Sequence, residues 1–77
     1  MESNTGIKIY PNPSNGEVYI AVSEQSNIKV YDIAGKLVDS FNVNLNETKT
    51  FNQRAGIYFV QIINIKGKIT MEKIIIQ

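Results

Sequence analysis

The segment from Asn27 to Val38 constrains the fold most strongly, because it reads as a β-strand, a tight turn and the start of a second strand. Ile28 and Val30 alternate with two polar or amphipathic residues, as a half-buried strand requires when successive side chains leave opposite faces. Asp32 can then accept a hydrogen bond from the backbone two residues on, and Gly35 can adopt a positive φ without a Cβ clash. The segment therefore predicts a β-hairpin, which indicates a fold class and leaves the activity open.

Alternating apolar residues and turn signals divide the rest of the chain into further short strands. No window carries a helical period with caps. Turn signals recur about every ten residues, a spacing typical of an antiparallel sandwich. The sequence therefore predicts an all-β antiparallel sandwich of about seven short strands. The expected strands are residues 7–10, 17–22, 26–32, 36–43, 48–51, 57–63 and 68–76.

Two local patterns refine this prediction. In residues 36–43 the apolar positions change parity between Val38 and Phe41, which predicts a β-bulge near Asp39-Ser40. Residues 32–36 and 64–68 both read Asx-Ile-x-Gly-Lys, but the likeness does not extend into the flanking strands. We therefore expect two hairpins with the same turn chemistry, and no internal repeat.

Composition excludes several classes of function. Eight basic and seven acidic residues give a net charge of +1, which is too balanced for a nucleic-acid footprint or an anionic-membrane patch. The absence of Cys and His removes the common nucleophile–base pairs and soft-metal sites. No two carboxylates have the spacing of a paired acid and base. We therefore expect a protein that is not an enzyme and has no catalytic residue, no cofactor and no metal.

The length of 77 residues leaves room for one domain with one thin core. Residues 1–6 are polar and lack the apolar stretch of a signal peptide, so we interpret them as a linker or as residues added by cloning. Apolar runs such as Ile74–Ile76 are far too short to span a bilayer, and no membrane span is expected.

Three carboxylates offer a candidate calcium site. Asp32, Asp39 and Glu47 could converge in space, but the chain has no dense loop of oxygen ligands. We therefore favour solvated loop and edge charges over metal binding at these positions.

Four tyrosines offer a second candidate, a platform for stacking sugars. Tyr58, two residues after Gly56 at the head of a strong strand, instead resembles the corner tyrosine of immunoglobulin-like sandwiches. Tyr10, Tyr19 and Tyr31 fit partly exposed strand faces, where the ring packs and the hydroxyl stays in water. Packing is therefore the favoured interpretation of all four residues.

Four blocks of sequence, distributed over Ile7 to Gln77, carry a more specific signal. They are Tyr10–Pro13 with Gly16, Val30–Asp32 with Gly35–Val38, Gly56–Val60, and Glu72–Gln77. In this order they resemble the C-terminal sorting domain of type IX secretion, of the type A family. Under this resemblance residues 7–77 form the sorting domain, and its motif residues are Pro11, Asn12, Pro13, Gly16, Asp32, Gly35, Lys36, Gly56, Tyr58, Lys73, Ile74 and Ile76.

The resemblance implies a secretion signal with an immunoglobulin-like antiparallel β-sandwich fold. Such domains close exported proteins of Bacteroidota-type bacteria, which pass through the periplasm to the cell surface or the medium. The implied partners are the type IX translocon, a surface sortase that removes the domain in many cases, and a covalently linked N-terminal cargo domain. Cleavage would fall at or upstream of Glu2 to Gly6. The alternative is an immunoglobulin-like accessory module of a bacterial surface protein that binds carbohydrate or a protein partner.

The physical basis of recognition is expected at the last strand, Thr70–Gln77. A translocon component could add a strand to this edge and read its side chains in pockets. Lys73 would either mark the strand for recognition or protect the edge from aggregation, and both interpretations remain open. Residues 11–16 and 32–36 are expected to determine turns more than to contact a partner.

Overall fold

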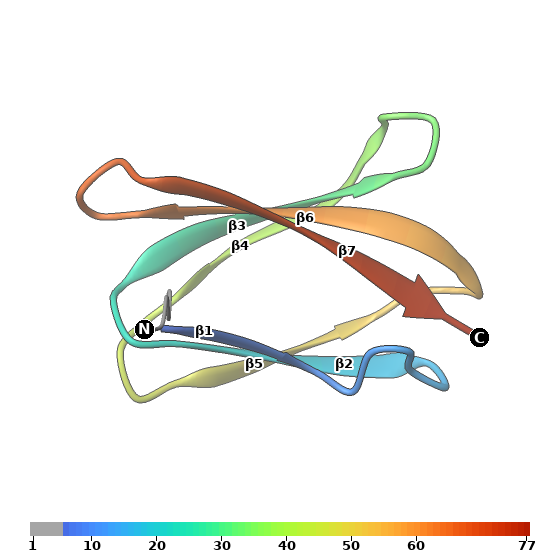
Figure 1. Cartoon of the computed structure of the whole chain (residues 1–77), viewed down its shortest axis with the longest axis horizontal. Coiled ribbons are helices and arrows are strands. Elements are labelled where there is room, and N and C mark those ends of the chain that lie inside the picture. The colour runs from blue at the N-terminus through green and yellow to red at the C-terminus, as the bar shows by residue number, and fades with distance from the viewer. Residues whose placement is uncertain (1–5) are drawn as a thin grey trace.

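The structure is a computed structural model that describes residues 6–77. These residues contain seven strands and no helix, and so no helix that could cross a membrane, which confirms the all-β prediction (Figure 1). The strands are β1 Ile7–Tyr10, β2 Glu17–Val22, β3 Ser26–Asp32, β4 Leu37–Val43, β5 Thr48–Asn52, β6 Gly56–Asn64 and β7 Ile69–Ile76. The first five residues of the expected linker, and with them most of the expected cleavage region, lie outside the described residues. Gly6 accepts a hydrogen bond from Ser23 N (2.8 Å) and so extends the pairing of β1 with β2.

The strands form two antiparallel sheets that face one another in Figure 1. One sheet has the order β1-β2-β5, and the other has the order β4-β3-β6-β7. The β1–β2, β3–β4 and β6–β7 connections stay within one sheet, whereas the other three connections cross from one sheet to the other. This arrangement is the immunoglobulin-like sandwich that the resemblance implies.

The core lies between the sheets and consists of the inward-facing residues of both. In β2, Val18, Ile20 and Val22 are all buried, as their parity predicts. Phe51 and Tyr58 close the core where the chain crosses from β5 to β6, with their rings edge to face at 5.9 Å between centroids. The remaining buried apolar residues are Ile28, Val30, Val43, Val60, Ile62, Ile74 and Ile76.

The bulge in β4 lies one residue earlier than the sequence predicts. Val30 pairs with Asp39 and Tyr31 with Leu37, so Val38 is the extra residue. The insertion turns Val38 to the inner side of the sheet, where it packs against the core together with Phe41. Leu37 is left on the outer side and is 47% exposed. The expected change of parity is therefore present, but the extra residue of the bulge is Val38.

The two Asx-Ile-x-Gly-Lys segments form the same turn. In the first, Asp32 Oδ1 accepts hydrogen bonds from Ala34 N (3.0 Å) and Lys36 N (2.9 Å). In the second, the amide oxygen of Asn64 accepts the two equivalent bonds, each 2.9 Å long. The glycine has a φ of 87° in the first turn and 83° in the second. The prediction of two hairpins with one turn chemistry is confirmed.

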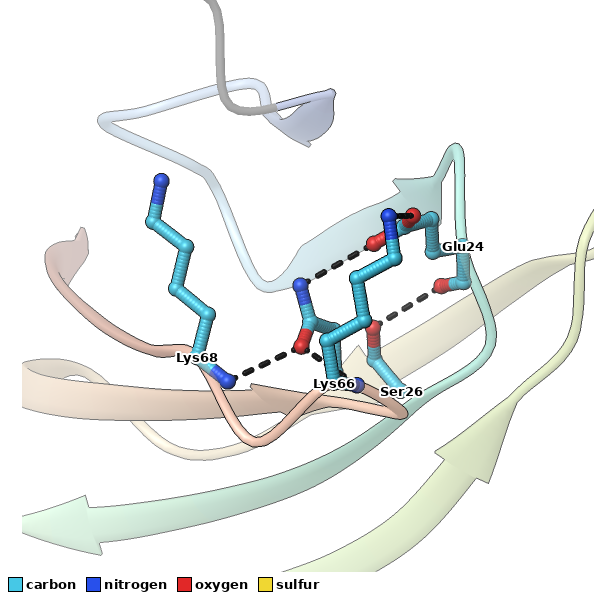
Figure 2. A network of polar contacts seen from close by, with 5 residues as sticks. Glu24, Ser26, Lys66 and Lys68 are labelled. Atoms are coloured by element: carbon cyan, nitrogen blue, oxygen red, sulfur yellow. Dashed lines mark hydrogen bonds and ion pairs between the residues drawn. The ribbon is translucent and has the colours of Figure 1, made fainter.

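A polar network ties the β6–β7 turn to the β2–β3 connection (Figure 2). Asn64 Nδ2 donates to Glu24 Oε1 (3.0 Å), and Lys66 Nζ lies 3.2 Å from Glu24 Oε2. Ser26 Oγ donates to the backbone oxygen of Glu24 (2.8 Å), and Ile65 N donates to that of Gln25 (3.1 Å). The Lys66 side chain is largely exposed, so its ion pair adds little, and the hydrogen bonds donated by Asn64 Nδ2 and Ile65 N join the two segments.

Candidate functional site

The predicted motif residues come from four segments that meet at one end of the sandwich. Since neighbouring strands run in opposite directions, the β1–β2 loop, the β3–β4 turn, the β5–β6 corner and the end of β7 all lie there, near the C-terminus in Figure 1. Pairing confirms this placement, because Ile76 lies opposite Gly56 on one side and Ser14 on the other, and Asp32 lies opposite Tyr58. We call this region the motif end.

The β1–β2 loop lies along the outer edge of β7 and behaves as a short additional strand. The Asn12 side chain donates from Nδ2 to Lys73 O (3.0 Å) and accepts at Oδ1 from Ile75 N (3.1 Å). Ser14 then continues with its backbone, since Ser14 N donates to Ile75 O (2.9 Å) and Gln77 N donates to Ser14 O (2.7 Å). Two motif blocks more than sixty residues apart are thus one structural unit. We call residues 11–16 the clip.

The clip is held in shape by Ser14, which the sequence did not single out. Its side chain is buried, with Oγ donating to Glu17 O (2.6 Å) and accepting from Gly16 N (3.0 Å). Gly16 has a φ of 140°, a conformation that side chains with a Cβ rarely adopt. The peptide bonds Tyr10-Pro11 and Asn12-Pro13 are both cis. Nothing local distinguishes Ser14 from other loop serines, because its role depends on the distant strand β7.

The β5–β6 corner is held by Tyr58. Its hydroxyl donates to Arg54 O four residues upstream (2.7 Å), and the side chain is 5% exposed. This is the hydrogen bond of the tyrosine corner in immunoglobulin-like sandwiches, as the position of Tyr58 after Gly56 predicts. The bond fixes the path of the chain from one sheet to the other.

A family model described as the secretion system C-terminal sorting domain matches residues 8–77, which contain all four motif blocks. The chain belongs to this family, the sorting domains of type IX secretion. The family is one of sorting signals and not of enzymes, and it implies export to the cell surface or extracellular space through interaction with the type IX machinery. No curated protein and no solved structure matches the chain significantly.

The edge of the sorting domain that was expected to be open is partly covered. β7 is an edge strand, but the clip occupies the outward backbone groups from Lys73 to Gln77. By the alternation of an antiparallel strand, the backbone of Ile69 and Met71 faces the same side. Within residues 6–77 no loop bond reaches this part. On the β7 edge, strand addition can therefore begin only at the first half of the strand, beside a groove of about 400 Å³ between β1 and β7.

Several motif side chains of the sorting domain are buried or bond within the fold, whereas others are exposed. Ile74 and Ile76 are 0% and 3% exposed and belong to the core. The Asp32 carboxylate bonds within its own turn, whereas Lys36 contributes its backbone nitrogen and leaves its side chain exposed. Lys73 is exposed and projects from the outer face of the four-stranded sheet, because its neighbour Ile74 points inward.

The carboxylates weighed for calcium each bond within their own segment. Asp39 Oδ1 accepts from Ser40 N (2.8 Å), and Glu47 Oε1 accepts from Asn44 N (2.9 Å). That bond from Asn44 lowers the pKa of the Glu47 carboxyl below its ordinary value. Among the residues that the structure describes, no three acidic side chains gather in a group that could hold a metal ion.

The four tyrosines do not form one platform. Tyr10 and Tyr19 stack at 5.5 Å between ring centroids on the outer side of the three-stranded sheet. A hydrogen bond from the Tyr19 hydroxyl to Glu17, and the charge of that carboxylate, raise the pKa of Tyr19. Tyr31 lies on the outer side of the other sheet, and Tyr58 lies in the core.

Proposed function

We propose that residues 7–77 act as a folded export signal. The domain leads a covalently linked N-terminal cargo from the periplasm through the type IX outer-membrane translocon. A surface sortase then removes the domain, or the cargo is released. The family match over residues 8–77 carries this proposal. The geometry supports it, since all four motif blocks meet at one end of the sandwich and the clip joins the first block to the last.

The burial of the motif residues favours recognition of the folded domain. If the machinery read an unfolded peptide, motif residues would not need to fill the core or complete turns. Ile74 and Ile76 are buried between the sheets, and both the nitrogen and the oxygen of the Asn12 side-chain amide are hydrogen-bonded to the backbone of β7. The motif therefore specifies a shape, and the machinery contacts the surface which that shape presents.

The test is export of a fluorescent cargo. A Sec signal peptide, the cargo and this domain are fused in that order and expressed in a type IX-competent bacterium. We expect cargo at the surface or in the medium, and retention in the periplasm when the translocon is deleted. Export that does not depend on the translocon would refute the proposal.

The role of the last strand is tested by a charge reversal. Deleting residues 73–77 removes Ile74 and Ile76 from the core as well as the partner of the clip, so it also unfolds the domain. Lys73→Glu changes one exposed side chain and leaves the fold intact. Lys68→Glu, an equal change at the opposite end, is the matched control. Poor export of folded Lys73→Glu alongside normal export of Lys68→Glu would assign Lys73 to recognition.

A second candidate function is an accessory module of a surface protein. The stacked and partly exposed pair Tyr10–Tyr19 favours this alternative, because such pairs can bind sugar rings. Retention of the domain in the mature surface protein, with sugar binding that Tyr10→Ala abolishes, would support the module. Proteolytic removal would support the sorting signal.

A further inference from the structure

The outer face of the four-stranded sheet is mainly apolar on β6 and β7, whereas its β3 and β4 side also carries Asn27, Lys29, Ser40 and Asn42. Its central cross-strand row runs Lys73, Phe59, Tyr31, Leu37 from β7 to β4. The register places Met71 beside this row and Ile69 beyond it, opposite Ile63. Leu37, Met71 and Ile69 are 47%, 53% and 57% exposed. We call this surface the apolar outer face.

On β6 and β7 this face departs from the pattern of a sheet with one side in water, in which apolar and polar residues alternate. In β6 the inward residues Tyr58, Val60 and Ile62 are buried, yet the outward residues Ile57, Phe59 and Ile63 are also apolar, with Gln61 as the polar outward residue between them. A strand that is apolar on both sides is typical of a sheet covered on both faces. Here the second cover is missing from the described chain, and a contiguous exposed apolar patch of this kind marks an interaction site.

The charges on the face select the kind of protein that covers it. Lys29 and Lys73 project from the outward positions of β3 and β7. Among the described residues of the four strands, no carboxylate projects beside them. Asp39 pairs with inward-facing Val30, and Glu72 pairs with inward-facing Val60. A second copy of the chain would bring lysines together in an apolar interface without a counter-charge, which is costly.

The size and position of the apolar outer face indicate further what kind of partner it binds. Four strands about 4.8 Å apart and about seven residues in length give an area on the order of 400 Å², about half of what one partner contributes to a stable complex. The contact is therefore transient, which suits a signal that must be released. Any preceding chain joins the domain through β1, which belongs to the other sheet (Figure 1).

We propose that the apolar outer face docks a component of the export machinery that presents an apolar surface with carboxylates opposite Lys29 and Lys73. This inference rests on the proposed function and adds the surface that is read. It also moves recognition away from the covered half of the β7 edge and onto the faces of β3, β6 and β7.

Variants on β3 and β6 test the face without touching the terminal strand. Phe59→Thr removes an apolar anchor and keeps a residue suited to strands, and Lys29→Glu reverses the charge. Lys8→Glu, on the outer side of the other sheet and outside the motif blocks, is the matched control. Denaturant melts of the purified domains select folded variants, with Met71→Thr and Lys29→Gln replacing any that unfold. We expect each face variant to lower cargo export about tenfold and the control to export normally.

A competition experiment separates docking from later steps. Free sorting domain, produced in the periplasm of the reporter strain, should lower export of the fluorescent cargo, whereas free Phe59→Thr domain should not. Normal export by folded face variants would overturn the inference, and so would equal competition by both free domains. In either case the proposed function would still stand if export of the unchanged fusion depends on the translocon. A dimer of the purified domain that Phe59→Thr abolishes would overturn it in favour of a second copy. Loss of translocon dependence in the unchanged fusion would instead refute the proposed function.

Discussion

Replacing Asn12 by Ala removes both side-chain bonds that fasten the clip to β7, Nδ2 to Lys73 O at 3.0 Å and Ile75 N to Oδ1 at 3.1 Å. Each such bond contributes about 0.5–1.5 kcal/mol net. Because water can reach the freed backbone groups, we expect the lower half of the summed range, a loss of about 1–2 kcal/mol. Small domains have stabilities near the low end of about 5–15 kcal/mol, so this is a large fraction of the total.

Urea denaturation measures this loss, and a thermal melt should show a decrease in Tm of about 4–8 °C per kcal/mol for a domain of this size. Amide hydrogen exchange gives a local test, because Ile75 N loses its acceptor and should exchange faster, while Val60 N in the centre of the sheet changes only with global stability.

Asn15→Ala is the matched control, since Asn15 lies in the same loop, is exposed and makes no side-chain bond within the described residues. We expect it to change stability by less than about 0.5 kcal/mol. Equal midpoints for the two variants, together with unchanged exchange at Ile75, would show that the amide of Asn12 does not hold the strand.

Three further changes test the turns, the corner and one acidic group. Gly35→Val and Gly67→Val should each cost about 1–2 kcal/mol in denaturant melts, because both positions have a positive φ and the space around the new Cβ is open, so backbone strain alone acts. Unequal costs would contradict the shared turn. Tyr58→Phe keeps the ring against Phe51 but loses the hydroxyl bond, and should destabilise the domain by about 1 kcal/mol in the same melts; no loss would mean that the bond does not hold the corner. The depressed pKa of Glu47 contributes stability above the ordinary pKa of glutamate that is lost as the pH falls through the folded value, and an NMR titration of the Asn44 amide should follow this loss; a Glu47→Gln domain with the same acid dependence would contradict it.

The clip that covers the β7 edge bears on the role of Lys73, the exposed lysine of this strand. An open edge strand exposes backbone groups that can pair with other chains, and charged residues are one way to prevent this. At the motif end the clip already fills these groups, so Lys73 is not needed there as an edge guard. Its side chain instead contributes charge to the apolar outer face, where it lies in one row with Phe59 and Tyr31.

The sequence by itself determined the strands and the tight turns, because both depend on neighbouring residues. Alternation in β2 and β3 placed Val18, Ile20, Ile28 and Val30 in the core, since side chains of a strand alternate between its faces. The Asx-Ile-x-Gly-Lys turns were predicted because the side-chain acceptor and the glycine act within five residues. The four blocks in their order along the chain were also sufficient to indicate the family, which the match over residues 8–77 confirmed.

Only the tertiary structure decided which backbone edges are paired and which apolar residues remain outside. Asn12 is hydrogen-bonded to Lys73 and Ile75, which lie more than sixty residues away, and no residue near Asn12 in the sequence predicts this contact. The bulge moved to Val38 because pairing with β3 and contact with the core, and not the parity of β4 alone, set its place. Likewise, the apolar run in β6 left open whether its second side is covered, and only the order β4-β3-β6-β7 shows that Phe59 faces outward on a sheet with no further layer in the described chain. These features depend on distant parts of the chain, because the residues of a strand do not specify which other strands pair with it or which segments cover its faces.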